Sequence, residues 1–207
     1  MKKKIAILGS TGSIGKSTLD IIEKDKKNFD IILLSTNTNV KEILKQTKKF
    51  KVKNIIITST QHFNKLSAVL KNKKINIYND FSNLDKIFSS KLDYVMSSIT
   101  GIPGLEPTLK IIKHTNKIAI ANKETIICSW NLIQKNLKKF KTEFLPVDSE
   151  HFSIWKILNG FNTNGIEKIY ITASGGPLLN IKKKYIKNIL PKQVIKRPMW
   201  SMGKKIS

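Results

Sequence analysis

Short apolar runs alternate with amphipathic stretches along the first 121 residues of the chain. The apolar runs predict buried β-strands at residues 5–8, 29–34, 54–58, 75–78, 92–96 and 117–121. The stretches between them repeat apolar residues at helical spacing and predict helices at residues 16–23, 40–50, 64–70, 80–88 and 107–113. Strands that alternate with helices favour a mostly parallel sheet with right-handed crossovers, so we predict an α/β fold.

A glycine-rich turn, residues 9–15, joins the first predicted strand to the first predicted helix. Gly9 allows a sharp turn off the strand, Gly12 lets the backbone approach a phosphate, and Gly15 lets the helix pack closely. The helix N-terminus then directs free N–H groups at an anion, which favours a nucleotide site of the Rossmann type. A tight turn without a ligand is the plainer alternative. A P-loop is disfavoured because Ser10 stands where that motif needs glycine.

The end of the second predicted strand carries polar, uncharged residues at positions 35–39. Sites that bind NAD usually hold the ribose 2′-hydroxyl with an acidic residue at this strand tip. No acidic residue stands here, and Lys41 follows closely. The segment therefore favours NADP(H) over NAD(H).

The pattern changes near Pro146, where we predict a domain boundary. Residues 1–146 form the predicted Rossmann-like domain, and residues 147–207 form a second α/β unit. In this second unit we expect a helix at residues 152–158, a strand at 166–173 and a helix at 181–189. Its apolar residues are too few to close a core alone, so we predict an incomplete domain.

Lysine dominates the charge of the chain, which has 38 basic and 14 acidic residues and a net charge of +24. Arg197 is the only arginine, and the lysines are spread over the whole chain. A solvated lysine surface explains this charge better than specific nucleic-acid binding. The lone Cys128 excludes a disulfide framework and a cysteine-based zinc site. No apolar run is long enough for a membrane span or a signal peptide, so we expect a cytoplasmic protein.

Asp148 and Glu150 are the strongest candidates for a metal site. In an extended segment, residues i and i+2 point the same way, so both carboxylates can meet one ion, and such a pair suits Mg²⁺ or Mn²⁺. A helix N-terminus capped by Ser149 is an equal alternative, because carboxylates also favour that end of the helix dipole. His151 would point to the opposite side of a strand, and we expect it to pack or to face solvent.

Three further stretches offer binding groups. Lys123 follows a predicted strand and can bind a phosphate, hydroxyl or carboxylate, or it can belong to a solvated turn. Ser174 begins a glycine loop that can offer N–H groups to an anion or simply turn the chain. Trp200 lies in a polar stretch, which fits a lid over a site or an aromatic side chain packed on a further part of the chain.

Six stretches of sequence occur together in one order along the chain. They are Gly-Ser-Thr-Gly-Ser-Ile-Gly (9–15), Gly-Ile-Pro-Gly-Leu-Glu-Pro-Thr (101–108), Ala-Asn-Lys-Glu-Thr (121–125), Pro-Val-Asp-Ser-Glu-His (146–151), Thr-Ala-Ser-Gly-Gly-Pro (172–177) and Trp-Ser-Met-Gly-Lys-Lys-Ile-Ser (200–207). This combination resembles the 1-deoxy-D-xylulose 5-phosphate reductoisomerase family. The resemblance implies an NADPH-binding Rossmann domain, a catalytic domain and a C-terminal helical domain in a homodimer. The implied reaction rearranges the sugar phosphate and reduces it with NADPH to 2-C-methyl-D-erythritol 4-phosphate, an isoprenoid precursor.

The resemblance also implies roles for individual residues and a divalent ion, Mg²⁺ or Mn²⁺, that holds the substrate oxygens. The implied NADPH contacts are Thr11, Gly12, Ser13, Ile14, Asn37, Thr38, Asn39, Asn122, Glu124 and Gly203. The implied substrate contacts are Lys123, Ser149, Glu150, Ser174 and Arg197. The implied metal ligands are Asp148 and Glu150. The implied catalytic residues are Lys123, Asp148, Glu150 and Trp200.

The sequence departs from the family pattern in three places. Thr38 stands where the family has a lysine near the cofactor. Arg197 stands where the family has a histidine, so it can hold a phosphate but cannot transfer a proton near neutral pH. The chain ends at Ser207, before the family's third metal-binding carboxylate and the Asn-Lys pair for the substrate phosphate. We therefore expect a truncated enzyme with little or no turnover. The alternatives are a product that only binds NADP(H) and, ranked third, a general nucleic-acid binder.

Overall fold

The structure, a computed structural model, describes all residues except 71–74, 161, 172–177, 179 and 196–207. The chain divides into two compact units, Met1–Lys156 and Ile157–Ser207. Among the described residues, no helix has the length and apolar content needed to cross a membrane.

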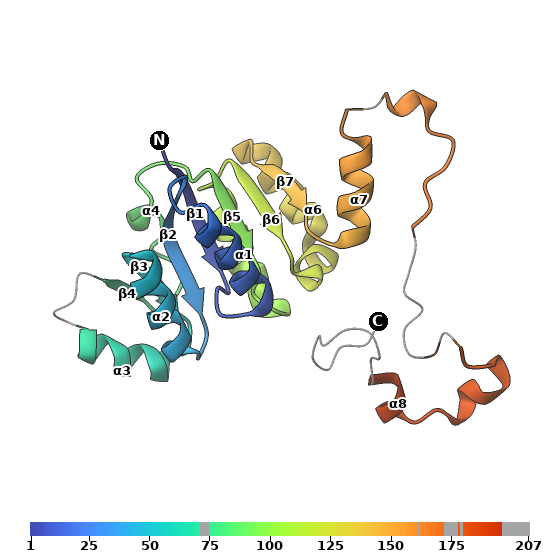
Figure 1. Cartoon of the computed structure of the whole chain (residues 1–207), viewed down its shortest axis with the longest axis horizontal. Coiled ribbons are helices and arrows are strands. Elements are labelled where there is room, and N and C mark those ends of the chain that lie inside the picture. Colours follow the sequence, from blue (N-terminus) through green and yellow to red (C-terminus); the bar gives the residue numbers. More distant parts are fainter. Residues whose placement is uncertain (71–74, 161, 172–177, 179, 196–207) are drawn as a thin grey trace. The chain divides into compact units, whose positions relative to one another are not determined.

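The first unit is built on a seven-stranded sheet with the order β4-β3-β2-β1-β5-β6-β7 (Figure 1). The strands are β1 (Lys3–Leu8), β2 (Phe29–Thr36), β3 (Asn54–Ile57), β4 (Asn76–Tyr78), β5 (Tyr94–Ser97), β6 (Lys117–Ile120) and β7 (Glu143–Pro146). All six pairings between neighbouring strands are parallel. The predicted α/β fold with a Rossmann-like parallel sheet is thereby confirmed.

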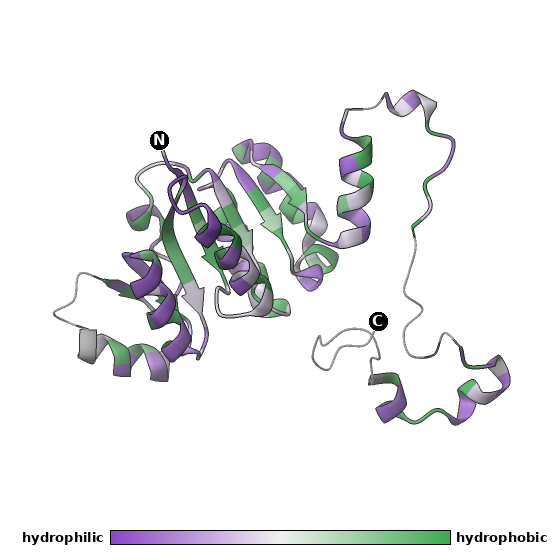
Figure 2. Ribbon diagram, in the orientation of Figure 1, coloured by the Kyte–Doolittle hydropathy of each residue, from purple (hydrophilic) through white to green (hydrophobic). Residues whose placement is uncertain are grey.

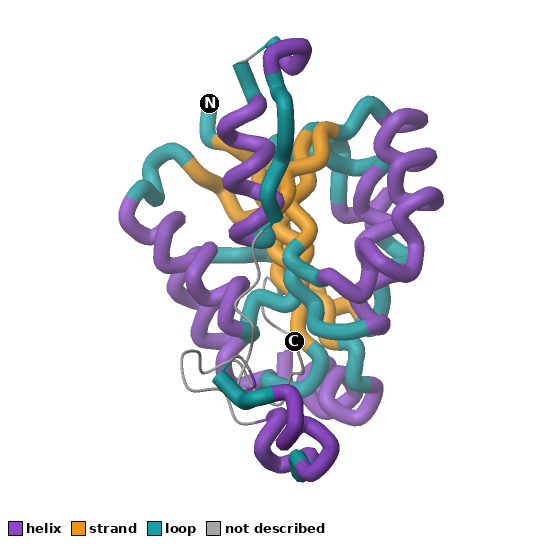
Figure 3. The backbone as a smooth tube through the Cα atoms, turned by 90° about the vertical axis from the view of Figure 1, so that its right-hand side faces the viewer, coloured by secondary structure: helices purple, strands orange, loops and turns teal. Residues whose placement is uncertain are grey.

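Helices cover both faces of this sheet (Figure 3). They are α1 (Ser13–Lys24), α2 (Val40–Phe50), α3 (Thr60–Leu70), α4 (Leu84–Ile87), α5 (Leu105–Ile112) and α6 (Lys123–Phe140), with a short 3₁₀ turn η1 (Ile102–Gly104) before α5. A further helix, α7 (Ser149–Leu158), follows β7 and has no buried residue. Buried residues of α1, α2 and α3 belong to one apolar cluster, and those of α4, α5 and α6 to a second cluster. The connections therefore wind in both directions from the centre of the sheet, as in doubly wound nucleotide-binding folds.

The two apolar clusters meet the strands on opposite faces. In β1, Ile5 and Ile7 belong to one cluster, whereas Ala6 and Leu8 belong to the other. All four side chains are at most 4% exposed. A central strand buried on both faces reads as a continuous apolar run, which explains the green strands of Figure 2.

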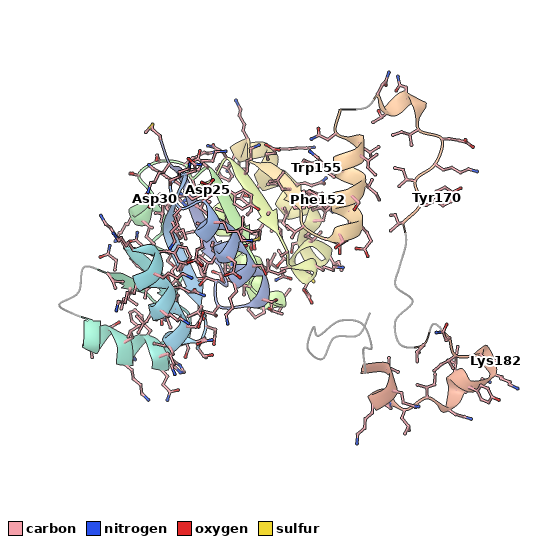
Figure 4. The ribbon with its side chains drawn as sticks, in the orientation of Figure 1. Asp25, Asp30, Phe152, Trp155, Tyr170 and Lys182 are labelled. Atoms are coloured by element: carbon pink, nitrogen blue, oxygen red, sulfur yellow. The ribbon has the colours of Figure 1, made fainter. Side chains whose placement is uncertain are left out.

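Several sequence predictions of helices and strands require correction. The segment after residue 121 forms α6 and β7, for which the sequence analysis predicted no element. The predicted helix at residues 80–88 is reduced to the single turn α4. In α7 the helix begins at Ser149 rather than at residue 152, and Phe152 and Trp155 project from it with ring centroids 5.7 Å apart (Figure 4).

In the second unit, the described residues form short helical turns, η2 (Thr163–Gly165), η4 (Lys183–Asn188) and α8 (Pro191–Ile195). The predicted strand at 166–173 is wrong for residues 166–171, and residues 172 and 173 lie outside the described part. Ile169, Tyr170 and Ile171 are all more than half exposed, so no neighbouring strand or helix covers them in the described structure. A lone strand is not stable in water, which accounts for the irregular backbone. The predicted helix at 181–189 is the 3₁₀ turn η4.

Candidate functional site

The glycine-rich turn between β1 and α1 has a backbone that only glycine fits at two positions. Gly9 has φ of +79°, and a Cβ atom there would lie 2.8 Å from the Ser98 carbonyl oxygen. A Cβ atom on Gly15 would lie 2.4 Å from the Gly9 carbonyl oxygen. The predicted sharp turn and close helix packing are thus both present. Gly12 is exposed, and its predicted approach to a phosphate stays a prediction.

The exposed side of this turn offers backbone donors. Gly12 stands at the N-terminus of α1, and no side chain caps the helix there. Ser13 and Ile14, in the first helical turn, are exposed. Uncapped N–H groups and the positive end of the helix dipole form a site for an anion such as a pyrophosphate. The Thr11 hydroxyl lies 2.8 Å from the Thr36 hydroxyl at the end of β2.

The predicted NADP(H)-selecting residues lie in the exposed loop after β2. Asn37 donates a hydrogen bond to the Thr58 hydroxyl at 3.0 Å. Asn39 caps α2, because its side-chain oxygen accepts from the Glu42 N–H at 3.2 Å. Thr38 lies between them and is exposed. The loop thus presents neutral polar groups beside the glycine-rich turn.

Asn122 is a residue whose structural role the sequence analysis missed. Its side chain is 4% exposed and donates to the carbonyl oxygens of Ile99 and Gly101, both at 2.6 Å. Its side-chain oxygen accepts from the Thr125 N–H at 3.1 Å and caps α6. Asn122 therefore ties the loop after β5 to the helix that follows β6. The signal that could have found it is an asparagine three residues before a threonine at the start of an amphipathic segment.

Lys123 and Asp148 form an ion pair between the Lys123 Nζ and Asp148 Oδ2 atoms. Lys123 is the first residue of α6, and Asp148 immediately precedes α7. His151 Nδ1 lies 2.8 Å from Asp148 Oδ1, and the His151 backbone N–H donates to the same oxygen at 3.4 Å. Both carboxylate oxygens of Asp148 thus contact positive or donor groups.

These contacts decide between the two alternatives that the sequence leaves equal. The segment 148–150 is a helix N-terminus and not an extended strand, and the capping oxygen comes from Asp148 instead of Ser149. His151 faces solvent, as the sequence predicts, with 66% of its side chain exposed. It also contacts Asp148, since residues three apart share one face of a helix.

The electrostatics of this cluster favour a charged carboxylate. Burial alone would raise the pKa of Asp148, but hydrogen bonds with Lys123 and His151 hold that pKa well below its usual range. The hydrogen bond with Asp148 raises the pKa of Lys123, and the nearby charges of Glu150 and Glu124 act in the same direction. Three carboxylates and one ammonium group therefore gather at the starts of α6 and α7.

The metal-binding groups of this cluster are two carboxylates, which fit a hard divalent cation but are few. Asp148 and Glu150 supply carboxylate oxygens, the ligand type that Mg²⁺ takes from proteins in ones and twos while keeping several waters. Within the described ranges, no group of three or more His, Cys, Asp or Glu side chains is arranged to hold a metal. Ser174, Arg197, Trp200 and Gly203, the other expected site residues, lie outside the described residues.

The topology of the sheet brings these separate segments to one edge. Strands β1, β5, β6 and β7 are adjacent and parallel, so their carboxyl ends point the same way. Gly9, Ser98, Lys123 and Asp148 each follow closely on one of these ends. The order of the chain connections reverses at β1 and β5, and ligands of open α/β sheets bind outside the carboxyl ends at such a point.

Comparisons with known proteins give one consistent result. The family model for 1-deoxy-D-xylulose 5-phosphate reductoisomerase matches residues 5–129, and the model for the C-terminal domain of that enzyme matches residues 144–207. The Pelagibacter ubique reductoisomerase is 58% identical over 207 residues, which are 99% of this chain and 53% of that protein. The Clostridium tetani enzyme is 39% identical over 99% of this chain and 54% of its own length. The chain thus spans about half the length of these curated relatives.

Solved structures of the same enzyme are also similar to this chain. The Zymomonas mobilis reductoisomerase in complex with NADPH superposes with a TM-score of 0.86 at 31% identity, covering 96% of this chain and 52% of that one. A reductoisomerase in complex with NADPH, fosmidomycin and magnesium gives a TM-score of 0.82 at 31% identity, covering 98% of this chain and 52% of that one.

Proposed function

The chain belongs to the 1-deoxy-D-xylulose 5-phosphate reductoisomerase family, and we propose that it carries the NADPH-binding part and two metal-binding carboxylates of that enzyme's active site. The proposal rests on one observation above all. The glycine-rich turn, Lys123 and Asp148 follow β1, β6 and β7, which are parallel strands of one sheet, so all three lie at the edge formed by the carboxyl ends of the strands.

The proposed reaction converts 1-deoxy-D-xylulose 5-phosphate, NADPH and a proton into 2-C-methyl-D-erythritol 4-phosphate and NADP⁺. NADPH, when bound, supplies the hydride, and a bound Mg²⁺ or Mn²⁺ supplies Lewis acidity at the substrate oxygens. The protein contributes positioning and charge, because a carbon skeleton rearranges only when its oxygens are held in a fixed arrangement.

Residue roles in this proposal follow the site geometry. The uncapped start of α1 binds the NADPH pyrophosphate through backbone N–H groups, and Thr11 flanks it. The neutral loop 37–39 accepts the 2′-phosphate without charge repulsion. Asp148 and Glu150 hold the divalent ion, and Lys123 contacts a substrate oxygen from the start of α6. Further proposed contacts are those of Ser13, Ile14, Asn122, Glu124 and Ser149, together with Ser174, Arg197, Trp200 and Gly203 outside the described residues.

Organisation and setting complete the proposal. Residues 1–146 form the NADPH-binding domain and residues 147–207 belong to the catalytic domain, with the lid around Trp200. A protein with the full length of its relatives forms a homodimer in the cytoplasm, and neither a membrane nor a specific nucleic acid is among its partners. Family membership supports these points.

A second candidate function is NADP(H) binding without turnover. One observation favours it: the described residues hold no group of three or more His, Cys, Asp or Glu side chains arranged to bind a metal. A metal site that lacks one charged ligand would turn over slowly, because losing one well-placed charged contact typically costs about a hundredfold or more in rate.

One set of measurements on the purified chain separates these functions. NADPH binding is followed by fluorescence titration, and turnover by the absorbance of NADPH in the presence of the sugar phosphate and Mg²⁺ or Mn²⁺. Metal-dependent oxidation that Asp148→Asn abolishes and Asp30→Asn leaves unchanged supports the enzyme. NADPH binding without oxidation supports the second function. Failure to bind NADPH contradicts both.

A further inference from the structure

The ammonium group of Lys123 contacts the Oδ2 atom of Asp148, at the place where a metal ion would bind this carboxylate. The Asp148 side chain is 17% exposed, so little of it remains open to ions from solution, whereas Lys123 is 54% exposed. The two residues come from the starts of α6 and α7, which follow the adjacent strands β6 and β7. The pair is therefore placed by the sheet rather than by local sequence.

The contacts of Asp148 leave one oxygen for a cation. Oδ1 already accepts from the His151 backbone N–H and lies 2.8 Å from the His151 ring. Oδ2 is the oxygen paired with Lys123. A metal ion that binds Asp148 through Oδ2 meets the lysine ammonium at the same place, and two positive charges a few ångströms apart repel each other strongly away from bulk water.

We propose that Lys123 is a built-in cation which a divalent metal ion displaces from Asp148, so that metal binding and release of Lys123 toward the substrate are one event. This inference rests on the proposed function, in which Asp148 is a metal ligand. A monovalent ion would replace one positive charge with another and gain nothing, whereas a divalent ion gains attraction to both Asp148 and Glu150. Lys123 therefore selects divalent over monovalent cations.

The first test measures Mn²⁺ binding to the purified 207-residue chain by electron paramagnetic resonance, without substrate. We expect Lys123→Met to bind Mn²⁺ about three- to tenfold more tightly than the wild type, since it removes the competing charge at a partly buried carboxylate. Lys123→Arg, which keeps the competing charge, is expected to bind no more tightly than the wild type.

A matched control removes a different paired lysine. Lys117 is the first residue of β6, at the opposite end of the strand from Lys123, and pairs with Glu143 at 2.7 Å. Lys117→Met lowers the net charge by the same amount and is expected to leave Mn²⁺ affinity at the wild-type value. An equal rise in Mn²⁺ affinity in Lys117→Met and Lys123→Met would show that net charge alone causes the effect, and would overturn the inference.

The second test follows Lys123 itself by trace acetylation and mass spectrometry. A lysine side chain released from its carboxylate is free to meet the reagent and reacts faster. We expect Mg²⁺ to raise acetylation of Lys123 several-fold relative to Lys117, and Asp148→Asn to raise it with or without Mg²⁺. Unchanged reactivity of Lys123 under Mg²⁺ concentrations that occupy the site would overturn the inference.

The two proposals fail in different ways. If Asp148→Asn abolishes Mn²⁺ binding but Lys123→Met does not tighten it, the metal site stands and the displacement of Lys123 is wrong. If Asp148→Asn leaves Mn²⁺ binding unchanged both in the wild type and in Lys123→Met, Asp148 is not a metal ligand. Both the proposed site and this inference are then wrong.

Discussion

Ser10 and Gln46 are joined by reciprocal hydrogen bonds across 36 positions of sequence. The Ser10 hydroxyl donates to the Gln46 side-chain oxygen at 2.7 Å, and the Gln46 amide donates to the Ser10 carbonyl oxygen at 3.0 Å. Both residues are at most 5% exposed. Gln46 on α2 therefore holds the glycine-rich turn in place from its buried side, and does not face the proposed nucleotide.

Replacing Gln46 should loosen this turn. Gln46→Leu leaves the buried Ser10 carbonyl oxygen without its side-chain donor, and we expect a loss of about 1–3 kcal/mol in the free energy of unfolding. Weaker NADPH binding should accompany it. Urea unfolding and fluorescence titration measure the two effects. The exposed Gln134→Leu on α6 is the control, and equal behaviour of the two variants would contradict the role of Gln46.

Gly15 should tolerate no side chain. The Cβ atom of Gly15→Ala would lie 2.4 Å from the Gly9 carbonyl oxygen and 2.5 Å from the Ser10 Cα atom, and neither backbone atom can rotate away. We expect a destabilisation of about 1–3 kcal/mol, the usual cost of overpacking. Gly165→Ala is the control, because a Cβ atom there meets nothing within 4 Å. Similar urea midpoints for the two alanine variants would show that the turn can shift.

Cofactor preference should favour NADPH over NADH. The exposed loop 37–39 carries no acidic residue, so nothing there repels a 2′-phosphate. Asn37→Asp should weaken NADPH binding about fivefold relative to NADH, from roughly 1 kcal/mol of repulsion at ~4 Å in water. Fluorescence titration with both cofactors measures the ratio, and Asn131→Asp on α6 controls for net charge. Equal affinity of the wild type for the two cofactors would rule out the prediction.

His114 should make stability depend on pH. The residue is 8% exposed, and burial together with the charge of Lys113 lowers its pKa, although Asp85 partly opposes this. Below about pH 6.5 the unfolded chain binds a proton that the native state resists, so the free energy of unfolding falls as pH falls. The slope due to one histidine cannot exceed about 1.4 kcal/mol per pH unit.

Urea unfolding of His114→Gln between about pH 7.5 and pH 5.5 tests this dependence. The variant should lose part of the wild-type slope, because its amide does not titrate. His62→Gln, in which the lost ring lies 2.8 Å from the Ser59 hydroxyl, controls for removal of a histidine. Identical slopes in the wild type and His114→Gln would show that His114 is not the responsible group.

The strands near the centre of the sheet can be predicted from the sequence because both of their faces are buried. Residues 5–8 and 55–57 show this as unbroken apolar runs. The edge strand β7 cannot be predicted in the same way, since it is half exposed and contains Glu143 and Pro146. In α6 the backbone departs from helical angles at Ser129, so the apolar residues before and after it do not form one continuous stripe.

The candidate site divides along similar lines. The glycine-rich turn can be recognised from residues 9–15 alone, although its contacts with Ser35 and Gln46 cannot. The contact of Lys123 with Asp148 depends on the adjacency of β6 and β7, which no short sequence pattern encodes. Whether residues 148–150 are extended or helical was an even choice from the sequence, and only the start of α7 at Ser149 decides it.

The position of β7 links metal binding to local opening of the sheet. This strand lies at the end of the strand order and pairs over four residues with β6 as its only described neighbour. Short edge strands open more readily than central ones, so amide hydrogens in β7 should exchange with solvent sooner than those in β1. Asp148 lies two residues beyond the end of this strand. A ligand that binds only when β7 is paired with β6 stabilises that paired state. An ion held at Asp148 would therefore slow hydrogen exchange in β7 and make the edge of the sheet a reporter of metal occupancy.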